Sequence, residues 1–158
     1  MKKIAILVLV LMVVAPLLRA QATQSGVESQ QISFGRIIIT DNSSARSCVI
    51  AATGAETCDP SVLLLISGQT GIYRLSGFDP NTALGAIIDQ ATPLSNSVDG
   101  TQLDIGSFTM NPSIDTNPQT PDASGNMTLK IGATLSTRAS TTYAIAPYHG
   151  TYRLTITY

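Results

Sequence analysis

The chain has 158 residues, of which 44% are hydrophobic and 12% charged, with nine Lys and Arg against ten Asp and Glu. This length allows one domain of ordinary size or two very small ones. The few basic residues exclude the positive stripe that nucleic-acid binding requires, and the aliphatic content exceeds that of a disordered chain. Composition therefore predicts a compact domain whose surface is rich in Ser, Thr, Asn and Gln, and it indicates no particular activity.

Residues 1–22 have the three-part layout of a secretory signal peptide. A short basic start precedes an apolar run over residues 4–18, and Ala20 and Ala22 supply the small side chains that a signal peptidase needs. The alternative is a membrane anchor, but about 15 apolar residues fall short of the roughly 20 that span a bilayer as a helix. We therefore expect a bacterial export signal cleaved before Thr23, and no transmembrane segment in the remaining 136 residues, whose net charge would be −4.

Cys48 and Cys58 are the only cysteines, and an even number in an exported chain predicts a disulfide, because the periplasm is oxidising. Their bridge would close a short loop with Gly54 near its middle and would contribute about 3 kcal/mol or slightly less. Two independent buried thiols are the alternative. A metal pair is a weaker interpretation still, because the only histidine, His149, lies far away along the chain.

The chain after residue 22 alternates apolar and polar residues with a period of two, which is typical of half-buried β-strands. Residues 127–135 and residues 151–158 are the clearest cases. In the second segment the apolar face consists of Tyr152, Leu154, Ile156 and Tyr158.

Shorter segments also have the composition of strands. Residues 102–110 alternate with a change of phase at Gly106-Ser107, which predicts a β-bulge. Residues 72–75 and 32–34 form shorter alternating runs. Continuous apolar runs over 37–39 and 62–66 predict strands that are buried on both faces.

Turn-forming residues separate these segments at regular intervals, so that seven or eight short strands predict a single-domain antiparallel sandwich. Residues 82–91 are compatible either with a helical turn capped by Thr82 or with a strand. Residues 111–126 contain three prolines and no period, which predicts a long surface loop, and loops of that length are usually functional or mobile.

The sequence contains no recognisable catalytic or metal-binding motif, and we expect no enzymatic activity, cofactor or metal. His149 is the only candidate base, and its position in a turn favours a solvated side chain. Asp115, Asn117 and Asp122 share one loop, but their spacing matches no calcium-binding loop.

Several segments together resemble chaperone–usher pilin subunits. Residues 31–35 (QISFG), 130–135 (KIGATL) and the closing segment 148–158 (YHGTYRLTITY) are similar to a bacterial pilin-like family of unknown function that is itself similar to the spore-coat-U-type pilins. The resemblance covers roughly residues 31–158, and its most specific part is the closing segment.

The resemblance implies an immunoglobulin-like β-sandwich that lacks its final strand. Such subunits expose a groove beside their C-terminal strand, which a periplasmic chaperone fills first and the N-terminal extension of the next subunit fills in the fibre. Strand addition of this kind gains affinity from main-chain hydrogen bonds and specificity from alternate side chains. The implied partners are other copies or related subunits, a periplasmic chaperone and an outer-membrane usher, with the fibre at the cell surface.

On this basis the chain divides into a signal peptide (1–22), an N-terminal extension (23–31) and a pilin-like domain (32–158). The C-terminal strand, with the apolar face named above, is the expected assembly element. The candidate donor residues are Val27, Ile32 and Phe34. The extension contains only Val27 as an apolar anchor, and the tyrosine that pilins carry next to last is here the terminal Tyr158.

The first hypothesis for the function is a structural subunit of a surface fibre assembled by donor-strand exchange. The alternative is a secreted or surface-exposed binding domain, such as an adhesin, whose fold is complete in one chain. A periplasmic accessory protein is a third interpretation. Polymers that resist mild denaturant would favour the first hypothesis, and a clean monomer would favour the second.

Overall fold

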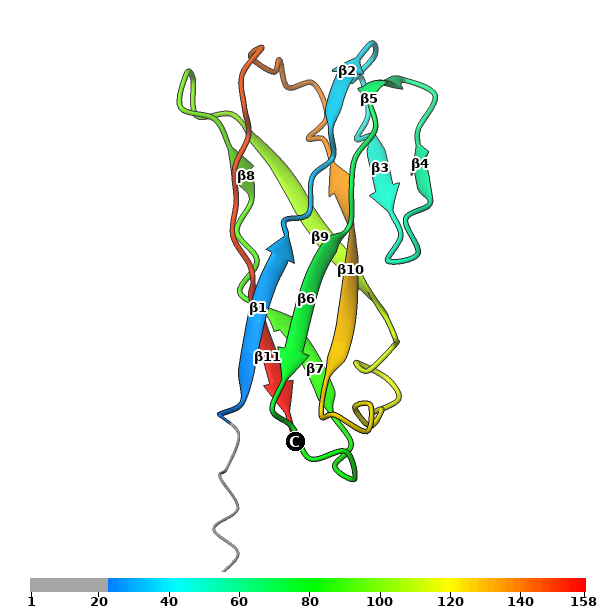
Figure 1. Cartoon of the computed structure of the whole chain (residues 1–158). Coiled ribbons are helices and arrows are strands. Elements are labelled where there is room, and N and C mark those ends of the chain that lie inside the picture. Colours follow the sequence, from blue (N-terminus) through cyan, green and yellow to red (C-terminus); the bar gives the residue numbers. More distant parts are fainter. Residues whose placement is uncertain (1–22) are drawn as a thin grey trace, which may run out of the picture.

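A computed structural model describes residues 23–158, so the predicted signal peptide lies outside the described residues. All regular structure in these residues is β-strand, and the paired strands are antiparallel, as Figure 1 shows. This confirms the predicted all-β, sandwich-like fold. Within residues 23–158 we find no helix of the length and apolarity needed to cross a bilayer. The strands are β1 (Ser25–Gln30), β2 (Arg36–Ile39), β3 (Ser47–Ile50), β4 (Glu56–Cys58), β5 (Val62–Ile66), β6 (Gly71–Ser76), β7 (Gly85–Asp89), β8 (Leu94–Ser95), β9 (Gln102–Asn111), β10 (Met127–Ser136) and β11 (Arg153–Thr157).

β10 is the centre of the main sheet because it pairs along both of its edges. Its first half pairs with β6 and its second half with β3, while β9 runs along the other edge. β1 extends the sheet beyond β6, and β4 extends it beyond β3. The inward side chains of β10 are almost completely buried: Leu129, Ile131, Ala133 and Leu135. The period-two strand predicted over residues 127–135 is therefore confirmed.

The predicted β-bulge in the segment 102–110 is also confirmed. Gly132 and Thr134 of β10 face Thr109 and Gly106 of β9, so that β9 contains one residue more than β10 between these pairs. Ser107 lies in this interval with a φ of 45°, a left-handed backbone conformation that occurs in one type of bulge. The bulge explains why the alternation of apolar residues changes phase there.

Two further pairs of strands, β7–β11 and β2–β5, pack against the main sheet. Residues 82–91 were compatible with a helical turn or a strand, and the structure shows the strand β7, which pairs with β11 over five residues. The main core cluster joins β7, β9 and β10 and consists of Ala86, Met110, Ile114, Leu129 and Ile131. A second cluster lies between β3, β5, β9 and β10 and consists of Cys48, Val62, Leu103 and Leu135.

The prediction that residues 37–39 and 62–66 are buried on both faces is wrong. Val62 is 5% exposed, whereas the four residues that follow it are 40% to 59% exposed, and Ile38 is 45% exposed. β2 and β5 pair only with one another among the described strands, and their pair packs through one face against the second core cluster. Nothing else within residues 23–158 covers the opposite face.

The domain also begins earlier than residue 32. Ser25–Gln30, expected to be an extension, forms β1 and pairs with β6, whereas Ile32–Phe34, expected to be the first strand, makes a single bridge from Ser33 to Gln69. The difference arises because the edge of β6 supplies the hydrogen-bonding partners for β1, so that this polar segment becomes a strand without any apolar alternation of its own.

The segment 111–126 is held by the fold rather than lying free on the surface. Ile114 is 1% exposed and belongs to the main core cluster. Leu84 and Gln119 exchange two backbone hydrogen bonds of 2.8 and 3.1 Å. The prediction of a surface loop therefore fails for these anchored residues, and the rest of the segment remains exposed.

The predicted disulfide joins Cys48 of β3 to Cys58 of β4. The two cysteines are directly opposite in the antiparallel pair, and Cys48 is 1% exposed within the second core cluster. The bridge thus fastens the short edge strand β4 to the sheet.

Removing this bridge should lower the free energy of unfolding by about 3 kcal/mol, because the unfolded chain regains the entropy of a ten-residue loop. The measurement is urea denaturation of the oxidised protein against the Cys48→Ala/Cys58→Ala double variant. Reduced wild type provides the matched control, since it keeps both side chains. Identical unfolding midpoints for oxidised and reduced wild type would contradict the prediction.

Candidate functional site at the open edge of the sheet

The C-terminal strand belongs to a long ribbon that extends beyond β7 and β11. Leu154 faces Ile88 and Ile156 faces Ala86 in the β7–β11 pair. The pairing continues through a 2.8 Å hydrogen bond from the Thr92 backbone nitrogen to the Thr151 carbonyl oxygen. A bridge from Ser95 in β8 to His149 then ends the ribbon. Because β8 also pairs with β9, the ribbon continues the main sheet, which curls over its own core.

Two edges of this curled sheet are β1 and β11, and β4 is a further edge beyond β3. Among the described strands β1 pairs only with β6, and β11 pairs only with β7. β7 lies beside β9, since residues 86–88 and residues 107–110 line one shallow cleft. β11 lies across β6 and β10, because Leu154 and Ile156 pack on the main core cluster of β10, and Ile156 also packs on the cluster that contains Leu75 of β6. The unpaired edge of β11 therefore faces the side of the molecule that β1 borders, and we call this side the open edge.

The inward face of β11 places three of the four predicted assembly residues against the core. Tyr152, Leu154 and Ile156 are half-buried and pack on the main core cluster, with Ile156 also reaching Leu75 and Leu84. Tyr158 follows the last strand residue and is 67% exposed, with its ring centroid 5.4 Å from that of Phe78. Tyr152, Leu154 and Ile156 thus form a row that packs on the core without being completely buried.

A hydrogen-bonded chain of three side chains crosses the open edge. The hydroxyl of Tyr73 is bonded to Glu28 Oε1 at 2.8 Å and to the Tyr152 hydroxyl at 3.0 Å. The Tyr152 ring also contacts Phe108, with 5.3 Å between ring centroids. This cluster joins β1, β6, β9 and the start of β11, and it is the only side-chain link between the two sheet edges that the hydrogen bonds of residues 23–158 provide.

The environment of Tyr73 and Tyr152 favours the protonated form of each hydroxyl. Burial, together with the hydrogen bonds to Tyr152 and Glu28, raises the pKa of Tyr73 far above its usual value of 10.0, and burial raises the pKa of Tyr152 as well. Because the pKa in the folded state lies above that of the unfolded chain, this contribution to stability is complete below about pH 10. It is lost as the pH rises beyond that value.

An ion pair lies on the outer surface of the ribbon. Arg153 and Asp89 are paired residues of β11 and β7, and their side chains form two hydrogen bonds of 2.8 and 2.6 Å. The arginine lowers the pKa of Asp89 through these bonds and through its charge. The pair lies on exposed positions of β11 and β7, and the opposite edge of β11 has no partner among the described strands.

The candidate donor residues are not brought together. Val27 lies on β1 and is 57% exposed on the face away from the core. Phe34 packs against the second core cluster. Ile32, which lies between Val27 and Phe34 in the sequence, is half-buried. Sequence reasoning also missed Tyr73, Phe108 and Glu28 as neighbours of the C-terminal strand. The alternating segments around these residues indicated strands. The contact between the Tyr73 and Tyr152 side chains, however, forms only because the sheet curls.

The residues considered for chemistry lie elsewhere. His149 is exposed, and its backbone exchanges two 2.9 Å hydrogen bonds with Ser95. The Asp122 carboxylate accepts bonds from the backbone nitrogens of Ser124 and Asn126, which closes its own turn. Within residues 23–158 the cysteine, histidine and acidic side chains gather in one place only, namely at Glu56 beside the two disulfide cysteines.

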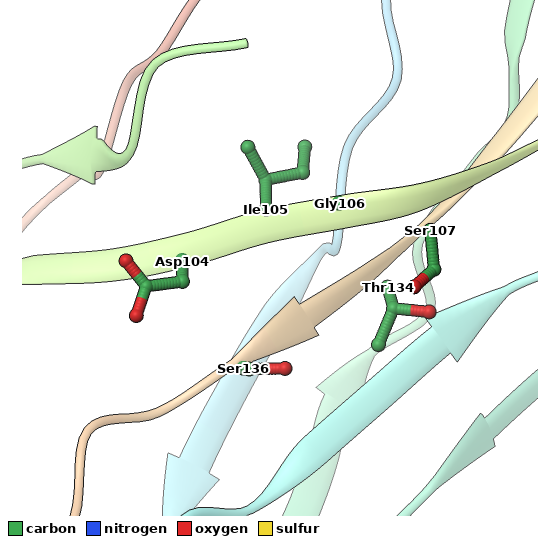
Figure 2. Close-up of a pocket in the computed structure, with 6 residues that line it drawn as sticks. All are labelled: Asp104, Ile105, Gly106, Ser107, Thr134 and Ser136. Atoms are coloured by element: carbon green, nitrogen blue, oxygen red, sulfur yellow. The ribbon is translucent and has the colours of Figure 1, made fainter.

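A shallow polar hollow lies over the β-bulge and is lined by residues of β9 and β10 (Figure 2). Its volume is about 170 Å³, and its lining includes Ser107, Thr134, Ser136 and Asp104. The Asp104 carboxylate binds Arg138 through two bonds of 3.1 and 2.6 Å, and these bonds lower its pKa. The hollow therefore offers hydroxyl groups and a carboxylate that is already paired with Arg138.

Comparison with known proteins yields one relationship. Searches among curated proteins and among solved structures return no significant match. A family model covers residues 25–158, which begin at β1 and include every strand described above. The chain therefore belongs to the family described as a domain of unknown function, DUF4402.

Proposed function

We propose that this protein is a structural subunit of a bacterial surface fibre, in which a strand from a neighbouring subunit pairs with the free edge of β11. The observation that carries the proposal is that β11 has a strand on one side only, although its inward side chains are part of the main core. The resemblance of residues 148–158 to the closing strand of pilin subunits supports the same assignment.

Strand addition would complete both the hydrogen bonding and the core. An incoming strand would pair with the backbone of β11, and its alternate side chains would cover Tyr152, Leu154 and Ile156 from the open edge. Each Leu or Ile side chain that becomes fully buried contributes about 1.5–3 kcal/mol. In this proposal the fold is immunoglobulin-like with its final strand missing.

An exposed edge with apolar side chains is prone to aggregation before assembly. The proposal therefore includes a periplasmic chaperone that covers β11 during transit and an outer-membrane usher that exchanges it for the next subunit. It also includes export through the signal sequence of residues 1–22, cleavage before Thr23, and a final location at the cell surface. The disulfide supports an oxidising compartment.

The donor in this proposal is β1. Its side chains are exposed except for Gln30, so releasing it from β6 uncovers little apolar surface of its own. Val27 is the apolar side chain that it can place in a neighbour's open edge. The subunit acts by assembly and not by catalysis, and the paired carboxylate of Asp104 and the exposed His149 are consistent with that role.

A second candidate function is a self-contained exported binding domain, such as an adhesin. The observation that favours it is the pairing of β1 with β6 within the same chain, over five pairs of residues. In that case β1 stays in place and the chain remains a monomer.

The experiment compares polymer formation by wild type, Val27→Asp and Val98→Asp, all produced from the full-length sequence. Val27 and Val98 are 57% and 71% exposed, so neither substitution should change the folding of a single subunit. Wild type is expected to form a ladder of oligomers that survives mild denaturant. Val27→Asp should abolish the ladder, because a carboxylate would enter an apolar site, and Val98→Asp should preserve it.

Circular dichroism provides the check that both variants fold. Equal ladders from both variants would refute β1 as the donor. A wild-type protein that stays monomeric at every concentration, including in the presence of its natural neighbours in the cell envelope, would refute strand addition and support the self-contained domain.

A further inference from the structure

The side chains of β1 reverse the usual arrangement of a strand that covers a core, in which apolar side chains point inward and polar ones outward. In the pairing with β6, Gly26 faces Leu75 and Glu28 faces Tyr73. Leu75 is buried and Tyr73 packs on the main core cluster, and cross-strand partners lie on the same face of a sheet. Glycine and glutamate therefore occupy the core-facing positions of β1, whereas Val27 lies on the outer face and is 57% exposed.

Hydrogen bonds rather than apolar contacts therefore hold β1 on the sheet. Besides the backbone pairing, the Ser29 hydroxyl donates to a carbonyl oxygen of β6 at 3.2 Å, and Gln30 Nε2 donates to the Thr70 carbonyl oxygen at 2.7 Å. Tyr73 donates to Glu28 Oε1 at 2.8 Å, which is the one bond between two side chains that β1 makes within residues 23–158. A strand held in this way detaches at low cost, because water can replace its hydrogen bonds and it contributes no apolar side chain to the core.

The bond between Tyr73 and Glu28 differs from the other side-chain bonds of β1 because it involves a charged group and continues to β11. The Tyr73 hydroxyl lies 3.0 Å from the Tyr152 hydroxyl, and both rings pack on the main core cluster. Burial raises the pKa of Tyr73, so the hydroxyl keeps the proton that it donates to the carboxylate. Hydrogen bonds to ionised groups are stronger than those between neutral groups. We call the three residues Glu28, Tyr73 and Tyr152 the latch.

Donation of β1 to a neighbour is incompatible with a closed latch. Val27 and Glu28 are consecutive in β1, so their side chains point to opposite faces of the strand. A donated β1 that places Val27 in the open edge of another subunit therefore turns Glu28 away from that site. The bond from Tyr73 to Glu28 is lost when β1 leaves its own subunit, and the new position of β1 does not replace it.

We propose that the latch restrains β1 on its own subunit and thereby limits the release of the donor strand. The inference rests on the proposed function, because it concerns the supply of the strand that is donated. With the latch closed, β1 stays paired with β6 and Val27 remains in water. With the latch open, β1 separates more often from β6 and Val27 becomes available to a neighbour. Such restraint opposes premature exchange of strands between subunits.

The latch differs from an ordinary stabilising contact in the direction of its effect on assembly. Loss of a contact that only supports the fold should reduce both stability and polymer formation. Loss of the latch should instead speed polymer formation, because it raises the population of subunits whose β1 is free. The core should stay intact, since Glu28 is exposed and Tyr73→Phe removes only a hydroxyl group.

The test is hydrogen–deuterium exchange of proteins produced from the full-length sequence and diluted to the monomer. Glu28→Ala and Tyr73→Phe should each speed exchange in residues 25–30 by at least about threefold. The double variant should exchange no faster than the faster single variant, because both substitutions remove the same bond. The matched controls are Asp115→Ala, which removes another exposed carboxylate, and Tyr148→Phe, which removes a hydroxyl bonded outside the latch. Both controls should leave exchange in β1 unchanged.

The second measurement is the rate at which the ladder of oligomers forms at higher concentration. Both latch variants should form the ladder at least about threefold faster than wild type, and the two controls should match wild type. Unchanged exchange in β1, a double variant whose acceleration is the product of the two single effects, or slower ladder formation by the latch variants would each overturn the proposal. Faster exchange in β1 with no ladder from any protein would refute strand addition and leave the restraint of β1 by the latch standing.

Discussion

Replacing Ile131 with alanine is expected to lower the free energy of unfolding by about 2–5 kcal/mol. Ile131 is 0% exposed at the centre of β10 and belongs to the main core cluster with Ala86, Met110 and Leu129. The substitution removes buried aliphatic contacts and leaves a cavity, because the strands on both edges of β10 restrict how far the site can collapse. Urea denaturation followed by circular dichroism measures the loss.

Ile145→Ala is the matched control, since it removes the same atoms from a side chain that is fully exposed. Its free energy of unfolding should stay within about 0.5 kcal/mol of wild type. Equal losses in the two variants would mean that the packing around β10 described above is wrong.

Gly132→Ala should be at least as damaging, with an expected loss of about 3 kcal/mol or more. The position is buried in β10, where the chain leaving β3 approaches most closely. A Cβ atom there would overlap backbone atoms of Ile50, Ala51 and Ala52, which cannot move without breaking the pairing of β3 with β10. The cause is the approach of one backbone to another and not an unusual φ angle.

Gly106→Ala provides the comparison for this second prediction. Gly106 lies on the neighbouring strand β9, and a Cβ atom there meets nothing within 4 Å. Thermal unfolding of both variants should show a large decrease in Tm for Gly132→Ala and little change for Gly106→Ala. A Gly132→Ala protein as stable as wild type would contradict the close approach of β3.

The features that sequence predicted correctly depend on local pattern. Residues 127–135 alternate because each second side chain enters the core, and this pattern alone located β10. The phase change at Gly106-Ser107 located the bulge for the same reason, since one extra residue reverses the faces of a strand. The even number of cysteines and the expected oxidising compartment sufficed to predict the disulfide.

The features that sequence did not predict depend on distant partners. β1 is a strand because β6 has a free edge beside it, and its own composition gives no sign of this. The apolar runs of β2 and β5 indicated coverage on both faces, but coverage depends on what packs over them. The cluster of Glu28, Tyr73 and Tyr152 forms only once three separate segments have met.

The order in which strands pair also determines how fast this chain can fold. Leu154 pairs with Ile88, Ala133 with Ile50, and Glu28 with Tyr73, so most of the sheet joins residues that are far apart in sequence. Closing such large loops loses chain entropy before any contact compensates for it, and proteins with this kind of topology fold in milliseconds to seconds rather than microseconds. During that interval the side chains that later form the core are open to other molecules, so the search for partners within the chain competes with association between chains.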